Sequence, residues 1–202
     1  TKFFKSFLIY DNEFNLINSY NKMKLVPFGE FLPFEQILRT IGLKSLTNNY
    51  QSYSSGSNRD IIDINKNNLS FKILPLICYE IIYSGKIFEN DKFDYIINIS
   101  EDGWFGNSIG PYQHYSHSIF RAIESGKYVI RSANNGITAI VNPIGVAEQK
   151  ILFGKNGYID FREKRSVETT IFSKFGNKIF FVMILLYIFL IFSFNRNSNW
   201  VI

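Results

Sequence analysis

The chain has 202 residues, of which 46% are hydrophobic, 17% aromatic and 19% charged. This composition excludes a collagen-like, coiled-coil or disordered protein and predicts one domain with a sizeable core. The 22 Lys and Arg exceed the 17 Asp and Glu by five, which is too mild an excess to indicate a nucleic-acid partner. The high content of Phe, Tyr, Asn, Ile and Lys is typical of an AT-rich coding bias, which raises lysine content without an anionic ligand.

The first half of the chain predicts a β-hairpin, a loop and a buried strand. Residues 6–10 and 14–17 flank an Asp-Asn-Glu turn and predict the hairpin. The polar stretch 47–68, rich in Asn and Ser, predicts a loop. The apolar run 71–77 predicts a strand that ends at Cys78.

The second half alternates strands with a helix. Residues 95–100 predict a second buried strand, and a helix is expected to begin at Pro111 and to end at Gly126. Two further short strands are predicted at 128–131 and 138–141, joined through an Asn-Asn-Gly turn. This alternation predicts an α/β domain.

An apolar run near the C-terminus predicts a membrane helix. Residues 179–194 carry no charge and are flanked by Lys178 and Arg196. At 1.5 Å per residue the run spans ~24 Å, and the flanking cations can snorkel to reach both faces of a bilayer core of ~30 Å. A buried helix of a soluble domain is the alternative, but a chain this small offers little protein to surround a helix that is apolar on all sides.

The only cysteine, Cys78, cannot form an internal disulfide. A lone thiol is either a small packed hydrophobe or a reagent. A cysteine at the C-terminal end of a buried strand is held rigidly, which suits a nucleophile. A nearby Lys could neutralise the oxyanion that develops on the attacked carbonyl, and a carboxylate could carry the proton. Cys, Lys and Glu are thus the parts of a covalent acyl-transfer site.

Four stretches carry a family resemblance: YNKMKLVPFGEF at 20–31, ICYE at 77–80, WFGNSIGPYQH at 104–114 and RSANNGIT at 131–138. The chain resembles the nitrilase (carbon-nitrogen hydrolase) superfamily and, within it, the apolipoprotein N-acyltransferase family of the bacterial inner membrane. The resemblance implies an α-β-β-α sandwich. It implies a catalytic domain over 1–172 that is incomplete at its N-terminus, followed by a transmembrane helix over 178–196.

The same resemblance assigns roles to single residues. Cys78 would be the nucleophile that takes the acyl chain as a thioester, and Lys22, eight positions before Glu30, would stabilise the oxyanion. Glu30 and Glu80 match two further essential carboxylates of the family, which would orient the lysine and the tetrahedral intermediate. Tyr79 flanks the nucleophile as in the family and is expected to contact substrate.

The loop 100–104 differs from the sequence pattern of the family. The family has Asn and Ala where this chain has Glu101 and Gly103, while Trp104, on the loop that borders the lipid entrance in the family, is retained as a substrate-binding residue. The superfamily's general-base Glu lies some tens of residues before the lysine. Here Glu13 is the only Glu before Lys22, and its place in a hairpin turn makes it a poor candidate. The base is therefore expected to be absent from this chain.

The other charged residues and histidines in and after the predicted helix are expected to have structural roles. His114 and His117 stand three positions apart, but no Asp or Cys is suitably spaced to complete a metal site, and none is expected. Arg121, Glu124 and Arg131 are expected to form a structural ion pair or cap.

The implied chemistry is ping-pong acyl transfer without a cofactor. The expected partners are a phospholipid acyl donor, a diacylglyceryl apolipoprotein acceptor, membrane lipid and a possible separate polypeptide that carries an N-terminal half. A soluble amidase of the same superfamily and an inactive fragment remain alternatives. The excess of Lys and Arg before the apolar run favours a cytoplasmic catalytic domain. The resemblance favours the periplasmic face of the inner membrane, and we follow it because long domains translocate largely regardless of charge.

Overall fold

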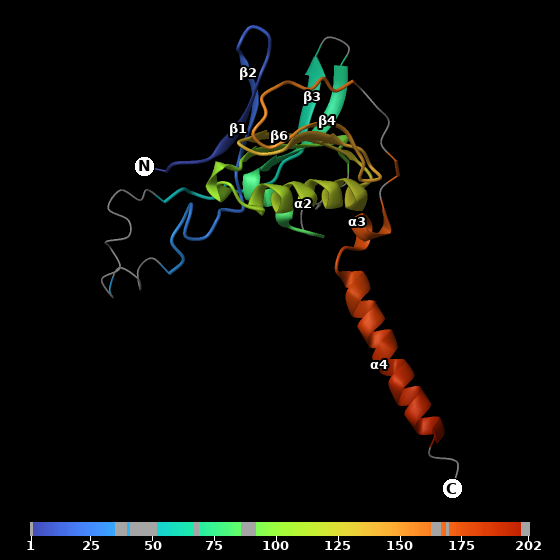
Figure 1. The fold of residues 1–202 in the computed structure, drawn as a ribbon. Helices are drawn as coiled ribbons and strands as arrows, with labels where there is room; N and C mark the ends of the chain where they lie inside the picture. Colours follow the sequence, from blue (N-terminus) through green and yellow to red (C-terminus); the bar gives the residue numbers. More distant parts are fainter. Residues whose placement is uncertain are drawn as a thin grey trace.

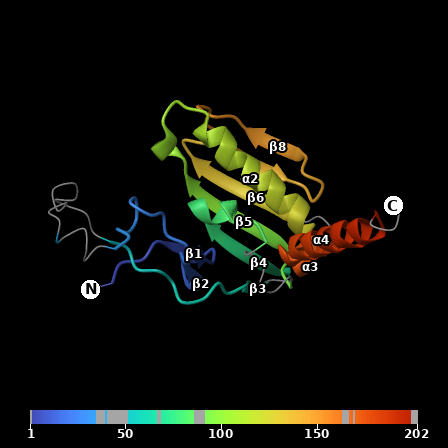
Figure 2. The same ribbon diagram turned by 90° about the horizontal axis from the view of Figure 1, so that it is seen from below.

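A six-stranded sheet forms the centre of the computed structural model, which describes residues 2–34, 40, 52–66, 69–85, 92–162, 167–168 and 170–198. The strand order is β3-β4-β5-β6-β7-β8 (Figures 1 and 2). The middle strands β4, β5 and β6 run parallel, and the outer strands pair antiparallel. The strands are β3 (Ile62–Lys66), β4 (Leu69–Ile77), β5 (Tyr95–Glu101), β6 (Tyr128–Asn134), β7 (Thr138–Val141) and β8 (Ala147–Ile151).

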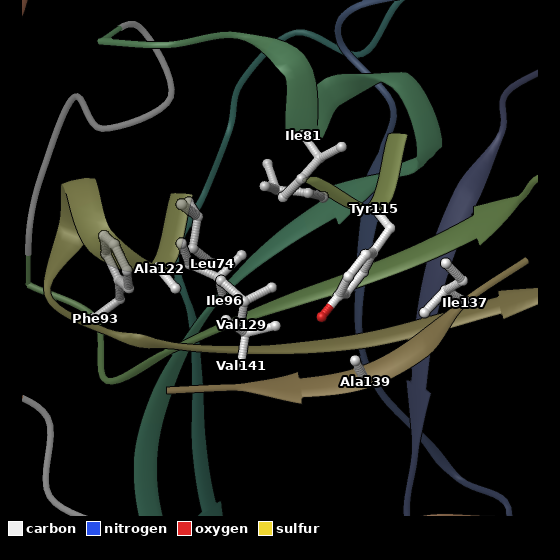
Figure 3. Packing of buried hydrophobic residues seen from close by; sticks show 11 residues of the cluster. Leu74, Ile81, Phe93, Ile96, Tyr115, Ala122, Val129, Ile137, Ala139 and Val141 are labelled. Carbon is white, nitrogen blue, oxygen red and sulfur yellow. The ribbon is translucent and has the colours of Figure 1, made fainter. Parts of the chain in front are cut away.

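Helix α2 (Gly110–Ser125) covers one face of this sheet (Figure 2). It begins with Pro111 in its first turn and ends at Gly126, whose φ of 68° is a left-handed conformation that glycine adopts without strain. Alternate residues of the parallel strands point toward it, which builds the main core (Figure 3). Fully or nearly fully buried members of this core are Leu74, Leu76, Ile81, Phe93, Ile96, Ala122, Val129, Ile137, Ala139 and Val141.

The opposite face of the sheet packs against a two-stranded hairpin. Strands β1 (Ser6–Tyr10) and β2 (Leu16–Asn21) pair antiparallel. Phe7 and Tyr20 of the hairpin share a second core cluster with Ile73 and Ile77 of β4. The described residues thus build a helix layer, a sheet and a second small sheet, which agrees with the predicted α/β class; a second helix layer is not among them.

Two predicted boundaries are wrong, and one strand was not predicted. The loop prediction over 47–68 fails at β3, where Ile62 and Ile64 pack inward and alternate with polar residues, a signal too short to read from sequence. Residues 47–51 and 67–68 lie outside the described residues. The second hairpin strand is β2 and not 14–17, because Phe14 sits in the turn with a φ of 61°. Strand β8, with one exposed polar face, was not predicted.

Two helices end the described chain, α3 (Ile171–Phe175) and α4 (Lys178–Ser198). Figure 1 shows α4 running away from the sheet. Every side chain over 180–192 is hydrophobic and exposed. In the part of the chain that the structure describes, no helix has both the length and the hydropathy needed to cross a bilayer, so the transmembrane prediction is not confirmed.

Candidate active site

Cys78 stands at a sharp elbow between β4 and the short helix η2 (Cys78–Ile82). Its backbone φ is 50°, a left-handed conformation that costs a residue other than glycine about 1–2 kcal/mol. Such strain is found mainly at functional sites, where the surrounding structure holds it in place. The thiol is partly exposed, and Sγ lies 3.8 Å from the carbonyl oxygen of Glu101 at the end of β5.

Glu80 ties this elbow to the segment that carries Lys22. Its side chain is completely buried, and Oε2 accepts a hydrogen bond from the backbone N–H of Ile77 at 2.9 Å. Its Oε1 accepts the backbone N–H groups of Met23 and Lys24 at 3.0 and 3.1 Å. One carboxylate therefore holds the backbone next to both Cys78 and Lys22.

Two further groups complete the surroundings of Glu80. The hydroxyl of Tyr20 donates to Oε1 at 2.7 Å, and the Arg59 guanidinium forms an ion pair with it at 3.0 Å. Burial, aided by the charge of Glu80, raises the pKa of Tyr20 to about 12, so the phenol stays a hydrogen-bond donor at neutral pH. Glu80 therefore faces protein groups on all these sides.

Lys22 and Glu30 form a buried pair on the other side of the site. Lys22 Nζ lies 2.8 Å from Glu30 Oε1 and is 0% exposed. Glu30 Oε2 accepts the backbone N–H of Val26 at 2.9 Å, and Lys5 makes a second ion pair with Oε1 at 2.8 Å. Burial alone raises the pKa of Glu30, but the hydrogen bonds from Lys22 and Lys5 outweigh it and hold this pKa below its usual value of 4.5.

A cavity of about 380 Å³ with mostly apolar walls opens at Cys78. Four of the six predicted site residues line it, namely Cys78, Glu30, Tyr79 and Trp104. The other two contact its wall from behind: Lys22 through Glu30, and Glu80 through the backbone on both sides. The remaining lining residues are Lys5, Val26, Gly29, Ile82, Glu101, Phe105, Gly110, Gln113, His114 and His117. Glu13 lies in the exposed turn of the hairpin.

Glu101 and Gly103 compensate each other structurally. The Glu101 carboxylate accepts the backbone N–H of Gly103 at 2.8 Å and the side-chain amide of Asn134 at 2.5 Å. A Cβ added at residue 103 would lie 2.5 Å from Glu101 Oε1. The two residues that differ from the family pattern are therefore in contact, and Gly103 leaves room for the side chain of Glu101.

Sequence reasoning missed two groups at this site. Lys5 shares Glu30 with Lys22, although nothing in its local sequence marks it. His114, considered only as a metal ligand, instead pairs with Asp102 at 2.8 Å. Arg131 also pairs with Asp102, whereas the expected ion pair between Arg121 and Glu124 is present at 2.7 Å. Within the described ranges, no three His, Cys, Asp or Glu side chains are grouped closely enough to hold a metal ion.

The sequence model of the carbon-nitrogen hydrolase family matches residues 1–153, so the chain belongs to that family and has its nitrilase-like α/β fold.

Among curated proteins, the chain is similar to apolipoprotein N-acyltransferases. The Rickettsia prowazekii protein is 43% identical over 183 residues, which cover 90% of this chain and 35% of that protein. The Bradyrhizobium diazoefficiens protein is 35% identical over 178 residues, which cover 88% and 33%. The chain thus spans about a third of the length of these relatives.

A solved structure, a mutant of Nesterenkonia AN1 amidase from the nitrilase superfamily, overlays on 73% of this chain and 51% of its own, at 12% identity and a TM-score of 0.49.

Proposed function

We propose that this chain carries the catalytic site of an apolipoprotein N-acyltransferase. The observation that carries the proposal is the cavity at Cys78, whose wall includes the carboxylate paired with Lys22 and whose nucleophile stands on a strained elbow. Relatives of that name, 35–44% identical over most of this chain, support the choice of reaction. The mostly apolar walls suit a fatty acyl chain.

In the first half-reaction, Cys78 Sγ attacks the acyl carbonyl carbon of a phospholipid ester. The thiol proton passes to the general-base Glu that the family places before the lysine. The Lys22 ammonium, which pairs with Glu30 behind the cavity wall, neutralises the oxyanion of the tetrahedral intermediate. The C–O bond then breaks, the alcohol oxygen of the lysophospholipid takes the proton that the thiol gave to the general-base Glu, and the acyl group remains on Cys78 as a thioester.

The two carboxylates and two aromatic residues have distinct parts in this proposal. Glu30 orients Lys22 through their ion pair at 2.8 Å. Glu80 fixes the nucleophile relative to the lysine segment. Tyr79 and Trp104 line the cavity, and Trp104 is 73% exposed, so we assign it to contact with lipid at the entrance.

In the second half-reaction, the amine of a diacylglyceryl-cysteine attacks the thioester carbon. The C–S bond breaks, an amide forms, the nitrogen gives up its proton, and the Cys78 thiol is restored. No cofactor takes part in either half.

We place α4 in the bacterial inner membrane with the catalytic domain on the periplasmic face. The support is the run of exposed hydrophobic side chains over 180–192, bounded by Lys178. A helix apolar on every side is stable in lipid and unfavourable in water. Protease added to spheroplasts should digest the catalytic domain, and protection of that domain would contradict the orientation.

The test of the function is N-acylation of a diacylated lipopeptide by the full-length protein in phospholipid vesicles. The expected product is the triacylated lipopeptide, identified by mass, and none should form with Cys78→Ala. Hydrolysis of short amides without transfer to the lipopeptide would instead identify an amidase.

A further inference from the structure

His114 lies between Cys78 and a buried carboxylate. Its side chain extends from α2, is 4% exposed and borders the cavity. Nδ1 is 2.8 Å from Asp102 Oδ1, and Nε2 is 3.3 Å from the backbone carbonyl oxygen of Cys78. The imidazole therefore bridges the elbow to the loop after β5.

Asp102 is itself firmly held. Arg131 Nη2 lies 2.6 Å from Oδ2, and the Ser100 hydroxyl donates to Oδ1 at 2.7 Å. Arg131 is buried and also donates to Asn98 and to the carbonyl of Ile137. Burial alone raises the pKa of Asp102, but the hydrogen bond from His114 and the charge of Arg131 keep this pKa below its usual value.

The two nitrogens of the His114 ring face different groups. Nδ1 lies near the Asp102 carboxylate and, at 3.3 Å, near the Arg131 guanidinium, whereas Nε2 faces the carbonyl oxygen of Cys78. A peptide carbonyl can only accept hydrogen bonds, so the contact with Cys78 needs a proton on Nε2.

We propose that His114 is a positioning residue, whose Nε2–H donates to the carbonyl of Cys78 and so, as a clamp, fixes the strained elbow that presents Sγ. The inference rests on the proposed function in taking Cys78 as the nucleophile. The elbow needs such support because its left-handed backbone is unfavourable for cysteine. A displacement of the nucleophile by as little as 1 Å can lower a rate about 100-fold.

Two substitutions separate the clamp from a merely structural role. In His114→Gln the amide nitrogen occupies the place of Nε2 and can still donate to the Cys78 carbonyl. In His114→Asn the amide nitrogen occupies the place of Nδ1 and can reach only Asp102. We expect the rate of Cys78 alkylation by iodoacetamide in the full-length protein to fall about 10- to 100-fold in the Asn variant. The Gln variant should retain the rate to within about threefold of the wild type.

Equal rates of Cys78 alkylation in the Asn and Gln variants would overturn the proposal. Thermal unfolding of both variants separates a loss of fold from a loss of position.

Alkylation requires no lipid, which keeps this test separate from the proposed function. If the wild type fails to acylate a lipopeptide but the Gln and Asn variants still differ in alkylation, the function is wrong and the clamp stands. If the lipopeptide is acylated but the variants are alkylated equally, the clamp is wrong and the function stands.

Discussion

Replacing Glu80 by Gln should both destabilise the fold and misplace the nucleophile. The substitution leaves the Arg59 guanidinium, whose side chain is 7% exposed, without its counter-charge. In the wild type both carboxylate oxygens accept backbone N–H groups: Oε2 accepts from Ile77 and Oε1 accepts from Met23. The NH₂ group of the new amide replaces one of these oxygens, so it faces a donor in either orientation. Breaking a buried ion pair from one side typically costs about 3–5 kcal/mol.

This cost is a large part of the total stability of a domain, which is about 5–15 kcal/mol. At about 2–4 °C per kcal/mol for a chain of this size, the midpoint of thermal unfolding should fall by roughly 6–20 °C. The assay is thermal unfolding followed by circular dichroism, together with Cys78 alkylation at a temperature where both proteins remain folded. Glu13→Gln, in the exposed hairpin turn, is the matched control and should change stability by no more than about 0.5 kcal/mol. A Glu80→Gln protein as stable and as reactive as the control would refute the positioning role of Glu80.

Three further predictions concern the neighbouring groups. Lys22→Met should leave a folded protein, because Glu30 keeps its ion pair with Lys5. The rate of thioester formation should fall about 10²- to 10³-fold, because the oxyanion loses its stabilising charge. A rate of acyl-adduct formation that falls less than tenfold would contradict this role of Lys22. Gly103→Ala should displace the Glu101 carboxylate. Glu101→Asn should therefore lower the free energy of unfolding by less in the Gly103→Ala protein than in the wild type. Additive losses of stability, measured by urea unfolding, would count against this coupling. The lowered pKa of Glu30 stabilises the folded protein at pH values above the usual pKa of 4.5, and this contribution is lost as the pH falls through the lower pKa of the folded state. In Glu30→Gln the free energy of unfolding should therefore fall less steeply with decreasing pH in the acid range. An unchanged dependence on pH would argue against this role of Glu30.

Much of the fold could be predicted because its signals are local. The apolar run before Cys78 became β4, and the Pro and Gly that bound α2 mark its ends within one residue. Strands β3 and β8 gave no comparable signal, since each is five residues long and has polar side chains on one face. Their identity depends on pairing with neighbouring strands, which no local pattern records.

In the candidate site, too, the contacts between residues close in sequence could be predicted and those between distant segments could not. The eight-residue spacing of Lys22 and Glu30 lies within one loop, and their ion pair is present in the structure. Apart from Ile77, the partners of Glu80 lie more than 20 positions away along the chain, and they include Arg59 in a stretch predicted as loop. Asp102, which pairs with His114, lies 12 positions away. Only the folded chain shows that Glu80 faces the protein interior and that His114 contacts the nucleophile's own carbonyl.

The central claim is that Cys78 carries the acyl group, and intact-mass measurement of the full-length protein after incubation with phospholipid tests it most directly. The account predicts one added fatty acyl mass that hydroxylamine removes, that disappears when a diacylated lipopeptide is supplied, and that never forms on Cys78→Ala. A fatty acyl adduct of the same mass on the Cys78→Ala protein would contradict the account.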